Sequence, residues 1–332
     1  MNTPRGFDGV IGHEEVIGHL QNAIRLNKIS HAYIFGGEQG SGKKMLANLF
    51  AMTLQCAEHG IEPCLSCPSC KKAQSRNHPD IIRITHEKPD SIGVDDVRTQ
   101  LVNDVDIKPY ESRFKIYIIE DAEKLTPQAQ NAILKTIEEP PAYAVIMLLA
   151  DNPEKLLPTI TSRAMTLNLK PVGNQLVKEY LVDQLHVPEE QAEIDASFAR
   201  GNIGRARKAA ESEDFQEMTM NALRLLRRSR TMELFEIVDA IKSMTAMKNN
   251  IYDYLDLFRM WFRDVLLFKA TKDVDGLIFR EELNAIRERA ARSSYEGIER
   301  ILDSIQTAEL RLRANVNFEL VMELLFLTIR EN

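Results

Sequence analysis

One short stretch constrains the fold more than any other: the glycine-rich GEQGSGKK at residues 37–44, which follows the apolar run AYIFGG. Apolar residues recur at helical spacing from Lys43 onward, so a buried strand, a glycine-rich loop and a helix are expected in that order. Such a loop turns backbone N–H groups toward phosphate, and the helix N-terminus adds a favourable dipole. The stretch predicts either a nucleotide-binding loop or a strand–turn–helix that binds nothing.

The last position of the loop argues against hydrolysis of a nucleoside triphosphate. A hydrolysing loop follows G-x-x-x-x-G-K-[ST], but Lys44 stands where a hydroxyl would hold Mg²⁺. The acidic partner expected after the strand KIYII is Glu120-Asp121, in which the usual order of Asp then Glu is reversed. Shifting a carboxylate by about 1 Å can cost on the order of a hundredfold in rate. We therefore expect no turnover and leave nucleotide binding open. The candidate nucleotide-binding residues are Gly37, Gly40, Gly42 and Lys43.

The first half of the chain alternates apolar and helical patterns. Buried strands are expected at 32–37, 81–84, 115–119 and 145–150, with helices at 94–101 and 127–139 and a short helix from Pro158. This alternation predicts an α/β domain, with a parallel sheet flanked by helices on both faces.

Beyond residues 167–175 only helical periodicity is found. A chain of 332 residues is long enough for two or three domains. We place a P-loop-like domain at 1–169, a small helical domain at 170–211 and an all-α domain at 212–332. The apolar stripes of the last domain indicate core packing, an oligomerisation surface, or both on different faces.

All four cysteines fall between residues 56 and 70, with the spacing C-x7-C-x2-C-x2-C. Clustered cysteines favour metal over disulfides, and two overlapping C-x2-C turns are typical of an all-thiolate zinc site. Cys56, Cys64, Cys67 and Cys70 are the predicted ligands of a structural Zn²⁺, because four sulfurs fill a tetrahedral site. The alternatives are four reduced cysteines in a loop, or His59 as a substitute ligand.

Composition narrows the remaining function classes. A net charge of −7 argues against a generally basic DNA-coating protein, and a standalone zinc-dependent DNA-binding protein is disfavoured for the same reason. The N-terminal MNTPRGFDGV has no apolar run, and the longest apolar run, AVIMLLA, is far shorter than the roughly 20 residues of a membrane helix. We expect a cytoplasmic protein with no membrane partner.

Several motifs in order resemble one family. They are FDGVIGHEEV, HAYIFGG, the four-cysteine insert, NHPD at 77–80, NAILKTIEEPP at 131–141 and TSR at 161–163. Over about residues 5–210, the chain is similar to bacterial sliding-clamp loader subunits of the AAA+ class. The resemblance implies an AAA+ domain, a helical lid and a helical collar that joins subunits.

Within that family, the chain resembles the non-hydrolytic delta-prime branch more than the gamma/tau motor branch. Besides Lys44 and the reversed acidic pair, Asp151 falls at a sensor position that is Thr or Asn in motors. Gly204 falls where motors place a sensor arginine, and Arg205 is one residue away, about 100° round a helix. An active gamma/tau-type ATPase with unusual substitutions is the alternative.

The resemblance also implies partners and one catalytic residue. Arg163 matches an arginine finger that acts in trans on ATP held by a neighbouring subunit. The implied partners are the gamma/tau and delta subunits and, through the complex, the sliding clamp and primer-template DNA. The chain would then be a component of the DNA polymerase III holoenzyme with no ATPase activity of its own.

Overall fold

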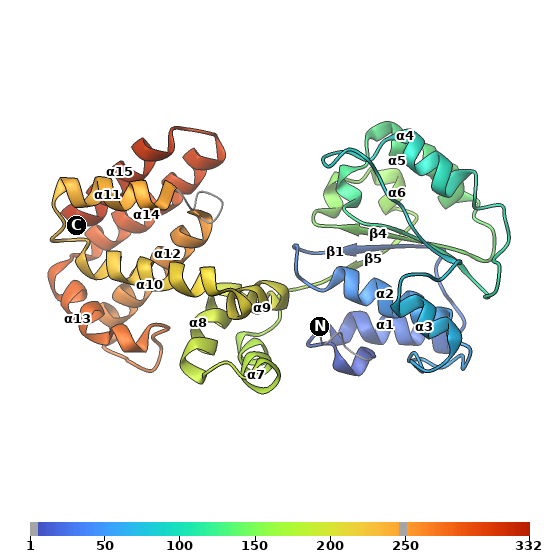
Figure 1. Ribbon diagram of the computed structural model, residues 1–332, viewed down its shortest axis with the longest axis horizontal. Coiled ribbons are helices and arrows are strands. Elements are labelled where there is room, and N and C mark those ends of the chain that lie inside the picture. The colour runs from blue at the N-terminus through green and yellow to red at the C-terminus, as the bar shows by residue number, and fades with distance from the viewer. Residues whose placement is uncertain (1–5, 246–250) are drawn as a thin grey trace. The chain divides into compact units, whose positions relative to one another are not determined.

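The computed structural model describes residues 6–245 and 251–332, which form two compact units. One unit contains the residues up to Leu176 together with Asn202–Gly204, and the other contains Val177–Gly201 and Arg205–Asn332. Figure 1 labels the elements of both units. Among the described residues, no helix combines the length and apolar composition required to cross a lipid bilayer.

The first unit is built on a five-stranded parallel sheet with the order β2-β3-β4-β1-β5. Its strands are β1 (Ala32–Gly36), β2 (Ile81–Arg83), β3 (Lys115–Ile119), β4 (Ala144–Ala150) and β5 (Met165–Asn168). Its helices are α1 (Glu14–Arg25), α2 (Lys43–Leu54), α3 (Pro68–Gln74), α4 (Val94–Val97), α5 (Pro127–Glu138) and α6 (Pro158–Thr161). The predicted α/β class is thus confirmed.

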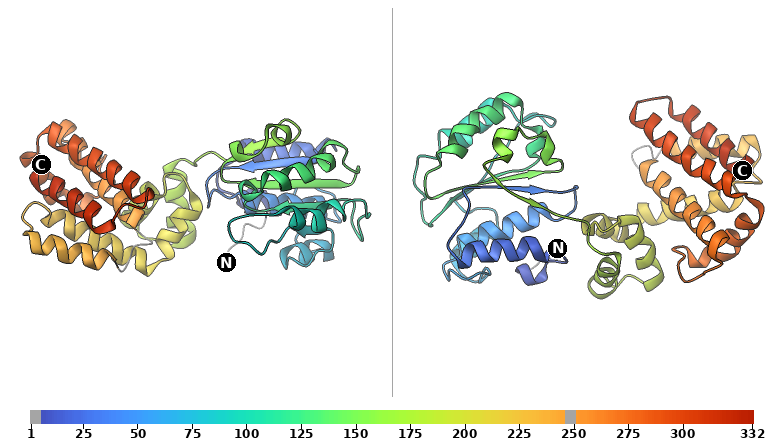
Figure 2. Two further views of the ribbon diagram at one scale, coloured as in Figure 1. Left: turned by 90° about the horizontal axis from the view of Figure 1, so that it is seen from above. Right: turned by 180° about the vertical axis from the view of Figure 1, so that it is seen from behind.

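Helices cover both faces of this sheet (Figure 2). Alternate residues of β1 point to opposite faces: Tyr33 and Phe35 pack in the core under α1 and α2, whereas Ile34 packs in the core under α5. Every residue of β1, β3 and β4 is buried, as expected for central strands of a parallel sheet.

The structure differs from the sequence prediction at one strand and at one helix. The strand β5 was not predicted, because it lies at the edge of the sheet and buries only Leu167. The helix expected at 94–101 is α-helical only to Val97 and continues as a wider π-helical turn over Arg98–Val102. Apolar periodicity does not distinguish these two kinds of turn.

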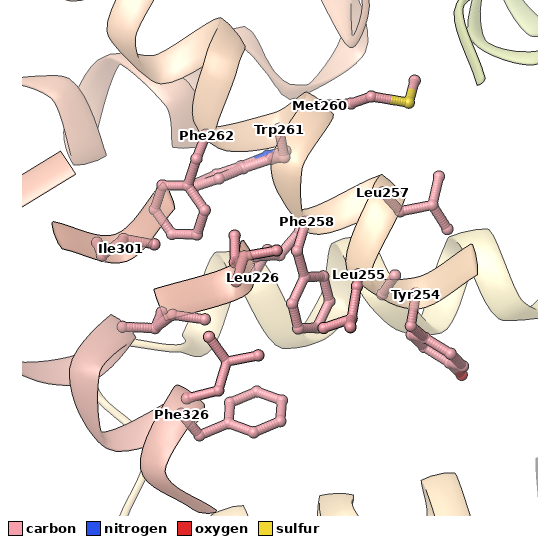
Figure 3. Close-up of a cluster of buried hydrophobic side chains, with 14 of the residues drawn as sticks. Leu226, Tyr254, Leu255, Leu257, Phe258, Met260, Trp261, Phe262, Ile301 and Phe326 are labelled. Carbon is pink, nitrogen blue, oxygen red and sulfur yellow. The ribbon is translucent and has the colours of Figure 1, made fainter. Parts of the chain in front are cut away.

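The second unit is helical. Its helices are α7 (Asn174–Leu185), α8 (Glu189–Ala199), α9 (Ile203–Glu211), α10 (Glu213–Arg228), α11 (Leu234–Thr245), α12 (Ile251–Thr271), α13 (Leu283–Arg292), α14 (Tyr295–Arg313) and α15 (Phe318–Glu331). The first residues of α7 and α9 belong to the other unit. The long helix α12 packs against α10, α13 and α14, and its buried aromatic side chains Phe258, Trp261 and Phe262 form the centre of the core (Figure 3). Phe198 of α8 belongs to the same core. The boundary that we placed between a lid and a collar stays a prediction.

Candidate functional site

The glycine-rich loop has the backbone shape that its sequence predicts. Gly37, Gly40 and Gly42 have φ angles of 150°, 87° and 101°, in the region that disfavours any residue with a Cβ atom. The loop connects β1 to α2 at the carboxyl edge of the sheet. The strand, loop and helix therefore keep the geometry of a phosphate-binding loop.

Lys43 is held by the loop itself. Its Nζ donates to the carbonyl oxygens of Gly37 at 2.5 Å and Glu38 at 2.9 Å, and to Oδ1 of Asp151 at 2.7 Å. The side chain of Lys43 is 10% exposed. Three acceptors match the three donors of an ammonium group, so this lysine is satisfied without phosphate.

Lys44 and both residues of the reversed acidic pair also form ion pairs within the chain. Nζ of Lys44 lies 2.5 Å from Oε2 of Glu120, the first residue after β3. Asp121 adopts a left-handed backbone conformation and pairs with Lys124 at 3.0 Å. The lysine that replaces the Mg²⁺-binding hydroxyl is thus neutralised by the first of the two carboxylates.

A short segment after α8 lies against the loop within the same unit. Nδ2 of Asn202 donates to the carbonyl oxygen of Gln39 at 2.8 Å, and the backbone N of Gly204 donates to the carbonyl oxygen of Gly40 at 3.0 Å. A Cβ atom on Gly204 would lie 2.7 Å from Cα and O of Gly40. A side chain at Gly204, the position that the resemblance assigns to a sensor arginine in motors, would therefore clash with the loop backbone.

Arg205, the next residue, belongs to the helical unit. Its Nη2 lies 2.6 Å from Oδ2 of Asp256, and its guanidinium carbon lies 4.0 Å from the ring centroid of Phe198. These contacts give the arginine a structural role in its own unit.

Arg163 follows the short helix α6, which begins at Pro158 as expected. Its side chain is 41% exposed and pairs with Glu138, with Nη2 and Oε1 separated by 3.1 Å. Nη1 donates to the carbonyl oxygen of Thr159 at 3.2 Å. Glu138 is the last residue of α5, which Thr126 caps and Pro127 begins. This ion pair brings the TSR motif into contact with the NAILKTIEEPP motif.

The four cysteines converge between α2 and α3. The sulfur atoms of Cys56, Cys64, Cys67 and Cys70 all lie within 4.8 Å of one another, and those of Cys64 and Cys70 are 4.0 Å apart. A tetrahedral Zn²⁺ with Zn–S bonds of about 2.3 Å places its sulfurs roughly 3.8 Å apart. The cluster has a size that fits a metal ion. His59, the alternative ligand, is not part of it.

Backbone amides point at three of these sulfurs. The N–H groups of Cys64, Cys67 and Cys70 donate to the sulfurs of Cys56, Cys64 and Cys67 at 3.4, 3.4 and 3.3 Å. Cys67 also caps α3, whose first residue is Pro68. The Ser66 hydroxyl and then the Cys67 amide lower the pKa of Cys64 to about 6, whereas burial raises the pKa of Cys70. A cation would offset the cost of ionising the buried thiol.

Sequence reasoning missed the contacts that tie this cysteine cluster to the sheet. The ring of His78 lies 3.0 Å from Oγ of Ser69 on α3, and that hydroxyl donates to the carbonyl oxygen of Gln55 at 2.6 Å. The carboxylate of Asp80, which is fully buried, accepts N–H bonds from residues 110, 111 and 112 at 2.6–3.0 Å. The signal that the sequence offers for these contacts is the NHPD motif, which places polar residues directly before a buried strand.

Comparisons with known proteins find similarity to subunits of DNA polymerase III. A family model described as "DNA polymerase III, delta subunit" matches residues 12–173. The delta-prime subunit of DNA polymerase III from Bacillus subtilis is 31% identical over 316 residues, covering 94% of each protein. The tau subunit of the same organism is 29% identical over 346 residues, covering 96% of this chain and 61% of tau.

A solved structure of a DNA polymerase III gamma subunit-related protein from Thermotoga maritima is 20% identical and covers 95% of this chain and 98% of its own, with a TM-score of 0.46. Because the Bacillus subtilis delta-prime subunit matches along nearly the whole of both proteins, this chain belongs to the delta-prime family of bacterial DNA polymerase III clamp-loader subunits.

Proposed function

We propose that this chain is the delta-prime subunit of a sliding-clamp loader and acts in it as a largely non-hydrolytic stator. The observation that carries this proposal is the pairing of both loop lysines within the chain, Lys43 with Asp151 and Lys44 with Glu120. In a motor, the lysine at the position of Lys43 serves the phosphates, and a hydroxyl at the position of Lys44 holds Mg²⁺. Here ATP would have to displace Asp151 from Lys43, and its γ-phosphate would meet a carboxylate of the same sign.

Arg163 is the residue that we propose acts on a neighbouring subunit. Its partial exposure and its position after α6 leave the guanidinium accessible, while Glu138 holds it in a defined orientation. A planar guanidinium can contact two phosphate oxygens at once. ATP on an adjacent gamma/tau subunit would compete with Glu138 for Arg163, and the finger would supply charge to that transition state.

The four-cysteine cluster would hold one structural Zn²⁺. All four ligand positions are filled by Cys56, Cys64, Cys67 and Cys70, which leaves no open position for catalysis. The ion would fix the segment between α2 and α3, and the His78 and Asp80 contacts would transmit that order to the edge of the sheet.

The proposed partners are the gamma/tau and delta subunits, and through the complex the sliding clamp and primer-template DNA. The similarity of this chain to delta-prime and tau subunits of DNA polymerase III supports this assignment. A subunit of the replication machinery would act in the cytoplasm.

The second candidate function is an active gamma/tau-type ATPase, which the similarity to tau along 96% of this chain supports. Steady-state ATP hydrolysis by the isolated chain separates the two candidates. The stator predicts phosphate release no faster than a no-enzyme control, and its co-purification with gamma/tau and delta. Turnover at ordinary motor rates of about 1 s⁻¹ or more that disappears in Lys43→Ala would establish the ATPase instead.

A further inference from the structure

A buried arginine in the helical unit has no carboxylate partner among the residues that the structure describes. Arg289 on α13 is 5% exposed. Its Nη2 donates to the carbonyl oxygen of Ile329 near the end of α15, and its Nη1 lies 3.4 Å from Oγ of Ser229. Its guanidinium carbon lies 5.3 Å from the ring centroid of Phe262. These contacts cap a helix and fill space, but none carries a negative charge.

The charge that acts on Arg289 is a second arginine. Burial, and then the nearby charge of Arg230, lower the pKa of Arg289 to about 10, so Arg289 stays protonated at neutral pH. The neighbouring arginines Arg227, Arg228 and Arg292 each pair with a glutamate, whereas no ion pair involves Arg230 or Arg289 among the described residues. Residues 1–5 and 246–250 contain no Asp or Glu that could supply one.

Several donors around this pair are buried and unsatisfied. In the described part of the chain, Nε of Arg289, Nη1 of Arg230 and the hydroxyl of Ser293 have no hydrogen-bond partner. Ser293 is 2% exposed and follows Arg289 by one helical turn, and Arg230 follows Ser229, which Arg289 contacts. Leaving a buried donor without a hydrogen bond destabilises the fold, and more so when the group is charged. Within the described chain, these three donors, two of them on guanidinium groups, therefore lack an acceptor that an anion would supply.

We propose that Arg230, Arg289 and Ser293 form a binding site for a small oxyanion of the phosphate class inside the helical unit, beside the ends of α10, α13 and α15. A tetrahedral oxyanion has enough oxygens to accept from two guanidinium groups and a hydroxyl at once. The burial of Arg289 favours a free inorganic ion over the side chain of a partner. The site lies among helices that carry no residue of the glycine-rich loop, so its ligand is separate from any nucleotide held there.

The test uses inorganic phosphate as the probe and Trp261 as the reporter. Trp261 is the only tryptophan of the chain and is buried in the same core, 5.0 Å from Phe262 between ring centroids. Urea unfolding followed by Trp261 fluorescence is measured in sodium phosphate and in sodium chloride at equal ionic strength and pH. Ligand that binds only the folded unit moves the midpoint upward and saturably with its concentration.

Three variants give the experiment its specificity. Arg230→Met removes a guanidinium whose Nη1 has no partner in the described chain, and should weaken phosphate binding by about tenfold or more. Arg289→Met should abolish the response, although it also removes the contact to Ile329. Arg224→Met, at an exposed position on the same helix α10, should keep the wild-type response. A wild-type midpoint that phosphate does not move, or equal responses of wild type and Arg230→Met, would overturn the proposal.

Discussion

Replacement of Lys43 by methionine should destabilise the sheet-containing unit in the absence of any nucleotide. Methionine keeps an unbranched side chain, one heavy atom shorter, and removes the charge. The variant loses hydrogen bonds to the carbonyl oxygens of Gly37 and Glu38 and the ion pair with Asp151. A hydrogen bond to a charged group contributes about 1.5–3 kcal/mol, but such terms are not additive.

The solvent exposure of Lys43 and Asp151 determines how much stability the Lys43→Met variant should lose. Lys43 is 10% exposed but Asp151 is 45% exposed, so water would solvate Asp151 once the lysine is gone. Desolvation of the ammonium group is also relieved. We therefore expect a net loss of about 2–3 kcal/mol in the free energy of unfolding of this unit. Lys44→Met is the matched control, since the side chains of Lys44 and Glu120 are 48% and 34% exposed and exposed pairs contribute about 0–1 kcal/mol.

The assay is hydrogen exchange of the backbone amides of β1 and β4, which reports on this unit alone, with Trp261 fluorescence as the reporter of the other unit. Lys43→Met should accelerate exchange in the strands and leave the Trp261 transition unchanged. The reasoning fails if Lys43→Met and Lys44→Met exchange alike and wild type shows a saturable, ATP-dependent protection that Lys43→Met lacks. That result would make Lys43 a nucleotide ligand.

Two further predictions concern the metal cluster and a buried acid. Cys70→Ser should reduce bound zinc from about one ion per chain to well below one by metal analysis, and should raise hydrogen exchange in the segment 56–80 before the sheet is affected. Burial raises the pKa of Asp195 to about 6, so folding favours its protonated form. The helical unit is therefore most stable with respect to this group below the unfolded pKa near 3.8, and it loses stability as the pH rises toward 6. Asp195→Asn should therefore stabilise the helical unit at pH 7 by about 2–3 kcal/mol in Trp261-monitored urea unfolding, with little difference from wild type at pH 4; an equal effect at both pH values would contradict this cause.

Periodicity and turn chemistry were sufficient to predict most of the sheet. Continuous apolar runs marked β1, β3 and β4, because central strands of a parallel sheet are buried on both faces. The edge strand β5 carries one buried residue and so has no such signal. The cysteine spacing predicted a cluster that the fold assembles, because the turns between close ligands are local.

Contacts across long sequence separations could not be predicted. The sequence shows that Lys44 replaces a hydroxyl, but its ion pair with Glu120, 76 residues later, depends on the register of β3 beside the loop. The pairing of Lys43 with Asp151 and of Arg163 with Glu138 likewise depends on how strand and helix ends meet. The sequence showed which chemistry was missing, and the fold showed what had replaced it.

The most direct test of the stator account is clamp loading by a reconstituted loader that contains Arg163→Ala. Arginine fingers contribute roughly 10³–10⁵ in rate at the site they serve. The variant should assemble normally and retain its zinc, and should reduce the rate of clamp loading on primed DNA more than total ATP hydrolysis, because only the ATP facing this subunit loses its finger. Arg163→Lys should not restore loading, since a point charge lacks the planar fork. Loading at the wild-type rate by the Arg163→Ala complex would show that Arg163 is an ordinary surface residue and would contradict the account.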